Sequence, residues 1–342
     1  MMPKVSVIWL NYNSYSFIDV VLKSISSLLN LNYSNFEIII VDNASTDGSF
    51  EIITKYVELN KPSDVKVKII RNDKNLGYTG GNNIGWEARD PESKYVVFIN
   101  NDVIAHPDSL AHFIDYMESS EVAAANGLLY RDEQKNTIYG AGGYLDEWLT
   151  SILACGGNTF DMCQDAKKER LITYADGAYL VARVDAIRKF GFNGRPFIDE
   201  VFMYTDDVML SLRLWNHGQK VAYFPIEAGI HLTSLTARKT GAISYYPLRG
   251  RFITHAFIKT RYFRLKYFYY LRVKMMLQIL CMFISKKYCN AYSAVTDGYN
   301  LGRKLAKLYG YLSLYKAPYL KLDNFTLISR IFLPIRSMKK VL

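Results

Sequence analysis

Closely spaced cysteine pairs of the kind that hold structural zinc are missing from this sequence. Its 342 residues include four cysteines, and no two of them form a CxxC motif. Their spacing argues against a structural zinc site and against a disulfide scaffold, so we expect a reducing, cytoplasmic setting. We also expect no signal peptide, because Met1–Lys4 lead directly into a strand-like segment. The cysteines are Cys155, Cys163, Cys281 and Cys289.

Long apolar runs and acidic residues are both scarce in the C-terminal part of the chain. The longest uncharged apolar run there, near Met275–Ser285, is about half of the ~20 residues that a membrane-spanning helix needs. Residues 241–342 contain 19 Lys or Arg and two acids, Asp297 and Asp323, which gives a net charge of +17. The first 240 residues carry the other 23 Lys or Arg against 30 acids, a net charge of −7.

A block of one charge indicates an electrostatic partner, and nucleic acid and an anionic membrane are the two candidates. Nucleic acid would explain the basic tail, residues 241–342, but not the net negative charge of residues 1–240. We therefore predict no nucleic-acid partner. Basic and aromatic residues are interleaved in the run Tyr262–Tyr270, which suits the headgroup region of a membrane. We therefore predict that the tail lies on an anionic membrane surface. The alternative is that its aromatic residues cover the rest of the protein.

The first half of the chain alternates between two kinds of segment. Half of all residues are apolar, which excludes a disordered chain. Apolar runs typical of buried strands alternate with helix-like segments, and this order predicts an α/β fold with a mostly parallel sheet and helices on both faces. Strands are expected over 5–10, 37–41, 65–70, 95–99, 177–183 and 220–224, and helices over 17–29, 49–59, 82–89, 107–118 and 206–217.

Polar residues directly follow three of the expected strands, where a sheet of this kind binds its ligand. They are Asn11-Tyr12-Asn13, Asp42-Asn43 and Asn100-Asn101-Asp102. Asp42 could accept hydrogen bonds from a base or a ribose. The carboxylate of Asp102, with neighbouring amides and diphosphate oxygens, can complete a site for Mg²⁺ or Mn²⁺. Taken singly, each of these residues is equally typical of a turn.

A glycine-rich stretch follows the third expected strand. Glycines ahead of a helix allow the backbone to approach an anionic ligand closely, and asparagine side chains offer amides. The spacing differs from GxGxxG, so this stretch alone is weak evidence. The candidate ligand-binding residues here are Asn75, Gly77, Gly81 and Asn82.

Two adjacent acids, Asp206 and Asp207, begin the helix expected over 206–217. Acids favour helix N-termini for electrostatic reasons, and a pair of them after an aromatic run also suits a general base in a pocket wall. His231 follows the last expected strand, and such a histidine is either structural or a metal ligand.

Taken in order, these segments resemble family 2 glycosyltransferases of the GT-A fold, and most of all their rhamnosyltransferase-like branch. The resemblance rests on "VSVIWLNYN", "IIIVDNASTDGS", "NLGYTGGNNIG", "FINNDV" and "YTDDVMLSLRLWNHGQKVAYFP", which span about two-thirds of the chain. It implies an inverting enzyme that moves a sugar from a nucleotide-diphosphate sugar to an acceptor hydroxyl. The acceptor expected is a lipid-linked glycan or another cell-surface glycan precursor, reached from the inner face of the membrane.

The resemblance also implies roles for single residues. Asp42 corresponds to the acid that contacts the nucleotide base. Asn100–Asp102 correspond to the DXD motif, whose last acid touches the metal and the diphosphate, and Asn100 replaces its first acid. Asp207 corresponds to the catalytic base, and His231 to a metal ligand. The donor side includes Asn11, Asn13, Asn75, Gly77, Gly81, Asn82 and Asn101, and the acceptor side Asp176, Gly177 and Asp206.

This interpretation divides the chain into a catalytic domain, 1–240, and a basic, aromatic and helical C-terminal region, 241–342. The nucleotide-sugar half of the catalytic domain would cover about 1–127, and the acceptor half about 128–240. A sugar nucleotidyltransferase is one alternative, although the expected phosphate loop after the first strand is absent. A non-catalytic nucleotide-sugar or membrane-binding protein is another. A glycoside hydrolase would also use two carboxylates, but it needs no nucleotide site.

Overall fold

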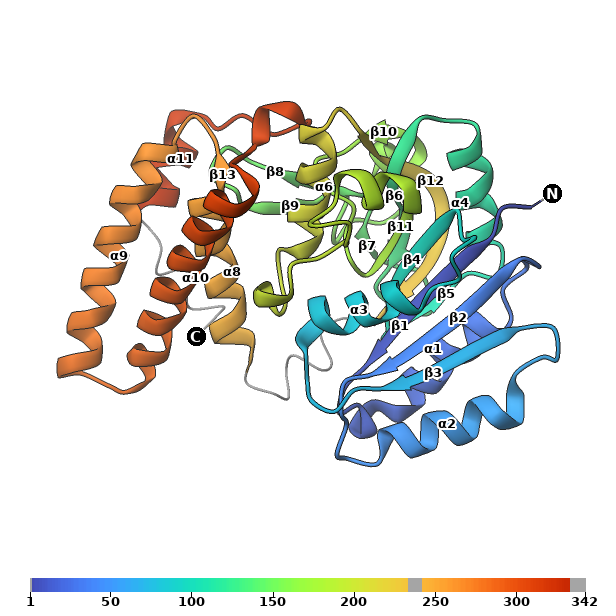
Figure 1. Cartoon of the computed structure of the whole chain (residues 1–342). Helices are drawn as coiled ribbons and strands as arrows, with labels where there is room; N and C mark the ends of the chain where they lie inside the picture. Colours follow the sequence, from blue (N-terminus) through green and yellow to red (C-terminus); the bar gives the residue numbers. More distant parts are fainter. Residues whose placement is uncertain (1, 233–241, 333–342) are drawn as a thin grey trace. The chain divides into compact units, whose positions relative to one another are not determined.

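The computed structural model describes residues 2–232 and 242–332, which form two compact units (Figure 1). The predicted boundary at residue 240 lies outside the described residues. Two short segments that the prediction assigned to the first domain, 144–152 and 203–205, belong to the second unit. The first unit comprises Met1–Gly143, Leu153–Phe202 and Asp206–Thr236, and the second Tyr144–Ile152, Met203–Thr205 and Ala237–Leu342.

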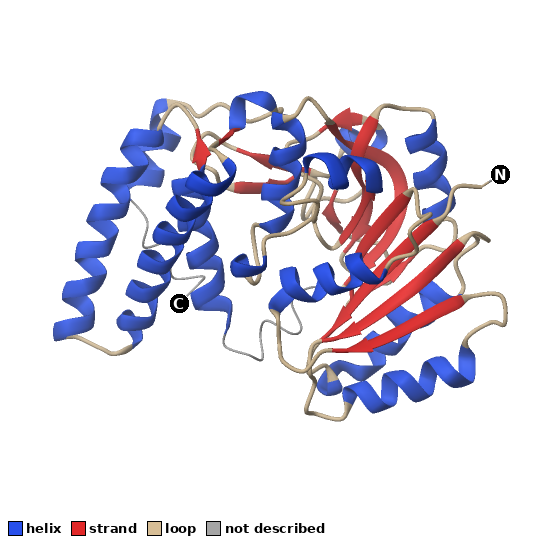
Figure 2. Cartoon of the chain, viewed as in Figure 1, coloured by secondary structure: helices blue, strands red, loops and turns tan. Residues whose placement is uncertain are grey.

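The first unit is built on one mixed sheet (Figure 2). Among the described residues its main path runs β10-β12-β6-β11-β4-β1-β2-β3, with β5 on β12 and β7 on β6. The four strands β4-β1-β2-β3 are parallel, and β11 runs antiparallel to β4. The bounds are β1 Val5–Asn11, β2 Phe36–Asp42, β3 Lys66–Arg71, β4 Tyr95–Asn100, β5 Val103–Ala105, β6 Val122–Tyr130, β7 Ile138–Gly140, β10 Arg170–Leu171, β11 Tyr179–Arg183 and β12 Lys220–His231.

Helices cover both faces of the parallel strands, which confirms the predicted α/β architecture. Residues of α1, α2 and α4 share a buried core with Val7 and Trp9 of β1. On the other face, α3 approaches Ile8 so closely that a Cβ on Gly85 would lie 2.4 Å from its Cγ2. The helices are α1 Ile18–Leu29, α2 Ser49–Asn60, α3 Gly77–Ala88, α4 Ser109–Glu118, α5 Val184–Phe190 and α6 Asp206–Asn216.

The second unit is helical, as predicted for the C-terminal region. Its core is centred on Trp148, which lies between the short paired strands β8 (Gly143–Leu145) and β9 (Ser151–Leu153) in the sequence. The Trp148 ring meets that of Tyr269 edge-on at 5.4 Å between centroids, and the His255 Nε2 lies 3.1 Å from the Trp148 carbonyl oxygen. The other elements are α8 Ala242–Phe257, β13 Ile258–Lys259, α9 Phe263–Phe283, α10 Lys287–Tyr309, β14 Leu312–Ser313 and α11 Asn324–Phe332.

The basic and aromatic run Tyr262–Tyr270 contributes to this core more than the membrane prediction assumed. Tyr269 and Tyr270 are buried, and so is Lys266, whose Nζ donates to Thr260 Oγ1 at 2.6 Å. A headgroup contact through these three side chains was therefore the wrong expectation. The period of the helix turns them inward while Phe268 stays exposed. Among the described residues no helix is both long and apolar enough to cross a bilayer.

The four cysteines form two disulfides, Cys155–Cys163 and Cys281–Cys289, which corrects the expectation drawn from their spacing against disulfides. In each pair the cysteines are eight residues apart, with Cα–Cα distances of 5.8 and 4.8 Å. A short turn can bring two Cα atoms into this range, whatever the sequence motif. The cysteines therefore give no support to a reducing compartment.

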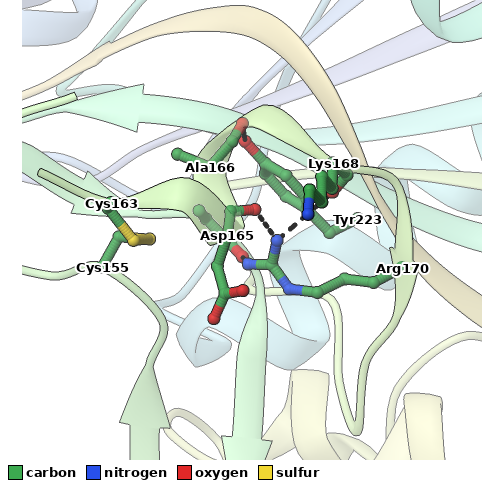
Figure 3. Close-up of a disulfide and its surroundings, with 8 residues drawn as sticks. Cys155, Cys163, Asp165, Ala166, Lys168, Arg170 and Tyr223 are labelled. Carbon is green, nitrogen blue, oxygen red and sulfur yellow. Dashed lines mark hydrogen bonds between the residues drawn. A yellow bond between two sulfur atoms is a disulfide. The ribbon is translucent and has the colours of Figure 1, made fainter. Parts of the chain in front are cut away.

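The Cys155–Cys163 disulfide lies in the connection between β9 and β10, and the residues that follow it are fixed to the sheet (Figure 3). The Tyr223 hydroxyl of β12 donates to the Ala166 carbonyl at 2.8 Å. The Arg170 guanidinium lies 4.5 Å from the centroid of the Tyr223 ring and donates to the carbonyls of Lys168, at 3.3 Å, and Asp165. The loop between β9 and β10 is thus held by side chains as well as by the covalent bond.

Candidate active site

Asn11 and Asp42 are paired across the ends of β1 and β2, as the strand-end rule predicts. Both are fully buried, and the Asn11 amide donates to Asp42 Oδ1 at 2.8 Å. Ser45 donates to the same carboxylate through its hydroxyl, at 2.6 Å to Oδ1, and through its backbone N–H, at 2.8 Å to Oδ2. The carboxylate therefore holds the turn from β2 into α2. A contact of Asp42 with a nucleotide base stays a prediction.

Asn13 belongs to the same polar cluster but is less buried. Its φ of 45° lies in the left-handed region, which asparagine tolerates better than most residues. Its backbone N–H donates to Ser45 Oγ at 2.9 Å, and its side-chain oxygen accepts the Thr46 N–H at 2.9 Å. The ends of β1 and β2 thus form one network. Its central hydroxyl, Ser45, was not among the predicted site residues.

The glycine-rich stretch is not a loop ahead of a helix, because α3 already begins at Gly77. Gly77 has a φ of 71°, and a Cβ there would lie 2.3 Å from the Phe202 carbonyl oxygen. A Cβ on Gly81 would lie 2.4 Å from Leu10 Cδ1. These two glycines therefore allow close packing within the protein. Their contact with a donor stays a prediction.

The predicted amides beside these glycines also have partners within the protein. Asn75 Oδ1 accepts the Gly77 N–H at 2.8 Å. Asn82 is buried, and its Nδ2 donates to the Tyr78 carbonyl at 2.9 Å, one turn back in the same helix. Both side chains stabilise the start of α3, so a role in donor binding also stays a prediction for them.

Asp102 and His231 lie in contact although 129 positions separate their numbers in the sequence. Strand β4 ends at Asn100, and β5 begins at Val103, which pairs with His231 at the end of β12. This pairing brings Asp102 Oδ1 to 3.1 Å from His231 Nε2. Both residues are buried. The structure therefore brings together the two residues predicted to hold a metal ion.

The neighbours of this pair complete a polar corner at the sheet edge. The ring of Tyr139 meets that of His231 edge-on at 4.4 Å between centroids. His231 Nδ1 is buried and has no hydrogen-bond partner within residues 2–232 and 242–332. Asn101 Nδ2 lies 3.4 Å from Asn11 Oδ1, which links this corner to the cluster at the ends of β1 and β2. Asn100 is half-buried, and its backbone N–H donates to the Ala178 carbonyl at 3.0 Å.

Asp207 faces the turn that precedes β11. Its Oδ2 accepts the Gly177 N–H at 3.2 Å, and its Oδ1 accepts the Val208 N–H at 2.8 Å. The Tyr78 hydroxyl donates to the Gly177 carbonyl at 2.9 Å. Because β11 runs antiparallel to β4, its start lies at the edge where β4 ends. Asp207 and Gly177 therefore belong to the same edge as Asn100.

Asp176 is held in this turn by Asn126, a buried asparagine of β6. The Asn126 amide donates to the carbonyls of Asp176, at 3.0 Å, and Tyr179, at 2.7 Å. Its side-chain oxygen accepts the Asp176 backbone N–H. Asn126 was not predicted as a site residue, although a lone asparagine inside the apolar run "VAAANGLLY" was a usable signal. No comparable signal distinguishes Tyr139 or Tyr78.

The three carboxyl groups of Asp176, Asp206 and Asp207 influence one another. Burial raises the pKa of Asp206 to about 7, and the charge of Asp176 adds to this effect. Burial also raises the pKa of Asp207 well above its usual value, with further contributions from Asp206 and Asp176. Burial raises the pKa of Asp176 as well, while His231 opposes the shift. A carboxylate with a raised pKa is suited to proton transfer.

The backbone immediately before Asp206 is strained. Phe202, Tyr204 and Thr205 have φ values of 70°, 67° and 66°. Such left-handed conformations cost residues other than glycine on the order of 1–3 kcal/mol each and cluster at functional sites. The strain supports a functional role for the start of α6.

A metal ion at Asp102 and His231 would need further ligands. Among the described residues no cluster of three or more His, Cys, Asp or Glu side chains could hold a metal. Hard divalent cations take oxygen ligands from phosphates and water as well as from protein. The pair therefore suits an ion that binds together with an anionic ligand.

A separate groove of about 770 Å³ lies beside α1 in the first unit. Ile104 and Ile230 line it together with residues of α1 such as Leu22 and Lys23. None of the predicted site residues is among those that line it. The candidate active site is therefore distinct from this groove.

Comparison with protein families gives a match for residues 6–186 to the model of "Glycosyl transferase family 2". An uncharacterized glycosyltransferase of Haemophilus influenzae is 35% identical over 125 residues, 36% of each chain. The rhamnosyltransferase WbbL of Escherichia coli is 26% identical over 219 residues, 61% of this chain and 78% of its own. The chain spans about a third to a half of the first curated relatives that it matches.

A further relative carries a donor and an acceptor in its name. It is the UDP-Glc:alpha-D-GlcNAc-diphosphoundecaprenol beta-1,3-glucosyltransferase WfaP of Escherichia coli. Its sequence is 30% identical over 121 residues, 35% of this chain and 44% of the relative.

Solved structures share the fold of this chain at low sequence identity. GalNAc-T7, solved with UDP, GalNAc and Mn²⁺, superposes with a TM-score of 0.62 at 13% identity, over 92% of this chain and 55% of its own. The mannosyltransferase PcManGT of Pyrobaculum calidifontis, in complex with GDP-Man and Mn²⁺, has a TM-score of 0.54 at 13% identity, over 90% and 88% of the two chains. These likenesses confirm the predicted GT-A fold.

Proposed function

The chain belongs to glycosyl transferase family 2, and from this we propose that it is an inverting glycosyltransferase. In this proposal it moves a sugar from a nucleotide-diphosphate sugar to an acceptor hydroxyl. The observation that carries it is the position of Asp207. This carboxylate has a raised pKa and shares one sheet edge with the Asp102–His231 pair.

Asp207 is the general base in this proposal. The N–H groups of Gly177 and Val208 hold its carboxylate at the start of α6, at 3.2 and 2.8 Å. Because its pKa is raised, the ionised carboxylate is a stronger base than an exposed aspartate. It takes the proton of the acceptor hydroxyl while that oxygen attacks the anomeric carbon.

The attack comes from the face opposite the leaving diphosphate. The new carbon–oxygen bond forms as the bond to the diphosphate oxygen breaks, and the diphosphate departs with that electron pair. The anomeric configuration is inverted, and no covalent intermediate with the protein is needed. Asp176, Gly177 and Asp206 lie around the base and would line the acceptor side.

Asp102 and His231 are the residues that would hold Mg²⁺ or Mn²⁺. Their Oδ1 and Nε2 atoms, 3.1 Å apart, supply an oxygen and a nitrogen, and the diphosphate and water would supply the rest. When bound, such an ion neutralises negative charge on the leaving diphosphate. The Mn²⁺ in the complexes of GalNAc-T7 and PcManGT supports this choice of ion.

The acceptor we propose is a glycan carried on a lipid, made at the cytoplasmic face of the membrane. The name of WfaP, with its diphosphoundecaprenol acceptor, supports the lipid carrier. The basic C-terminal region, with its net charge of +17, supports an anionic membrane as the surface where the enzyme works. Nucleotide sugars are multiply charged and do not cross bilayers unaided, so the enzyme would face the compartment that makes them.

A panel of nucleotide sugars tests the proposal. We expect one of them to be hydrolysed slowly in water and transferred faster when an acceptor is present, in both cases only with Mg²⁺ or Mn²⁺. Nucleotide-diphosphate rhamnose comes first in the panel, because WbbL is named a rhamnosyltransferase. Binding of a nucleotide sugar without any turnover would favour a non-catalytic binding protein instead.

A further inference from the structure

The connection between α9 and α10 exposes apolar side chains to solvent. We call residues Met282–Lys286 the hairpin tip. Met282, Phe283 and Ile284 are 67%, 77% and 67% exposed, and Ser285 and Lys286 are exposed beside them. Single exposed apolar residues are ordinary on protein surfaces, but a contiguous group of them marks an interaction site.

The exposed apolar surface continues from the tip along α9. Phe268, Met275 and Ile279 are also exposed. With Met282 they follow the spacing that places residues on one face of a helix. The opposite face, which includes Tyr270 and Leu277, is buried in the core of the second unit. The helix therefore has two apolar faces, and only one of them is covered by described residues.

Contacts between α9 and α10 hold the hairpin together behind its tip. The Cys281–Cys289 disulfide joins the end of α9 to the start of α10 directly behind the tip. Farther from the tip, the rings of Tyr270 in α9 and Tyr299 in α10 stack at 3.8 Å between centroids. The tip is joined to α9 by the Ile284 N–H, which donates to the Leu280 carbonyl at 2.9 Å. In this arrangement the apolar side chains of the tip are exposed to water.

Charge indicates what kind of partner this is. Helix α9 contains the exposed Arg264 and Arg272, the partly exposed Lys274 and no acid, and the exposed Lys286 lies in the tip itself. The two acids of residues 241–342 both accept hydrogen bonds. Asp297 accepts one from the Tyr245 hydroxyl, and Asp323 accepts one from the Thr326 hydroxyl. A second copy of the chain that docked through the same surface would bring two basic surfaces together. An anionic phospholipid membrane complements both the charge and the apolar side chains.

We propose that the hairpin tip and the exposed face of α9 insert at the headgroup level of an anionic phospholipid membrane. This proposal rests on the proposed function, in which the acceptor is carried on a lipid. Of the run Tyr262–Tyr270 it keeps the exposed Phe268 in the membrane contact but not Tyr269 and Tyr270, which are buried. The contact is peripheral, since basic residues at the headgroups and a few apolar side chains below them anchor a helix without crossing the bilayer.

Liposome flotation tests the proposal with a matched pair of variants. The test variant carries Met282→Ser, Phe283→Ser and Ile284→Ser together. The control is Leu308→Ser, which changes a side chain that is 62% exposed at the far end of α10. Vesicles contain either phosphatidylcholine alone or phosphatidylcholine with phosphatidylglycerol. Circular dichroism and thermal unfolding establish that both variants are folded.

We expect the wild type and Leu308→Ser to float with the anionic vesicles, less so as salt rises, and not with the neutral ones. The bound fraction of the triple variant should fall by about tenfold or more, because its anchoring side chains are gone. Hydrolysis of a nucleotide sugar in solution should be the same for all three proteins.

Three results would overturn the proposal. The first is a wild type that stays unbound on anionic vesicles at low salt, and the second is a triple variant that binds as well as the wild type. The third is a wild-type dimer in solution that the triple substitution dissociates, which would assign the tip to a second copy of the chain. A wild type that floats but turns over no nucleotide sugar would instead refute the proposed function.

Discussion

Replacing Asp206 with asparagine tests whether burial governs the carboxyl groups at the start of α6. The Asp206 side chain lies among buried residues and is 6% exposed. Asparagine has nearly the same shape and keeps a side-chain oxygen near the first turn of the helix, but it has no proton to release. The comparison between variant and wild type therefore removes the titration of Asp206 and, with it, the contribution of the Asp206 charge to the raised pKa of Asp207.

The expected change in the free energy of unfolding follows from the shift in the pKa of Asp206. Burial, with the charge of Asp176, raises the pKa of Asp206 from 3.8 to about 7. The folded protein therefore keeps a proton that the unfolded chain releases. The stabilisation from this proton is complete below the unfolded pKa and is lost as the pH rises through the folded pKa. At 1.36 kcal/mol per pH unit, the wild type should lose about 3 kcal/mol between about pH 5 and about pH 7.

Urea unfolding without divalent metal, at about pH 5 and about pH 8, measures this effect. The free energy of unfolding of Asp206→Asn should rise relative to the wild type by about 3 kcal/mol over that interval. Asp132→Asn is the control, because hydrogen bonds from Asn136 and Thr137 lower the pKa of Asp132 and its titration falls below the interval. A difference between Asp206→Asn and wild type that does not change with pH would refute the reasoning.

Two further predictions concern the groups around the base. Asp102→Ala should lose both the response to Mg²⁺ or Mn²⁺ and most donor affinity, since its carboxylate is the anionic partner of His231; full activity of the wild type in excess chelator would contradict this. Asn126→Ala leaves the buried N–H of Asp176 and the carbonyls of Asp176 and Tyr179 without their side-chain partner. It should lower the free energy of unfolding by about 3 kcal/mol or more and reduce kcat, and an unchanged urea midpoint would argue against this role.

The parallel strands could be predicted from the sequence almost residue by residue. Strands β1, β2 and β4 differ from the expected ranges by one or two residues, because strands buried on both faces are continuous apolar runs. Strand β12 runs on to His231, well beyond the predicted end at Phe224. Pro225 and Gly229 are residue types that are common in turns. In the structure they lie within the strand, which tolerates them because it is bulged where its register shifts near Glu227.

Some residues of the candidate site could be predicted from the sequence, and others could not. Asn11, Asp42 and Asp102 could be predicted because the ends of parallel strands meet at one edge. The contact between Asp102 and His231 was expected only from the family resemblance, and in the structure it depends on the pairing of β5 with β12. The contacts of Asn126 and Tyr139 depend on which distant segments meet, and the spacing of residues along the chain carries no such information. Both disulfides are local, since each joins cysteines eight residues apart, but this spacing is not a recognised pairing motif.

The most direct test of the central claim is a comparison of transfer and donor binding in Asp207→Asn. Single-turnover transfer measures the chemical step, and calorimetric titration with the nucleotide sugar measures donor affinity. The account predicts that the transfer rate falls by ~10²–10⁴, because the general base is lost. Donor affinity should stay near that of the wild type. A folded Asp207→Asn protein that transfers sugar at the wild-type rate would contradict the assignment of Asp207 as the base.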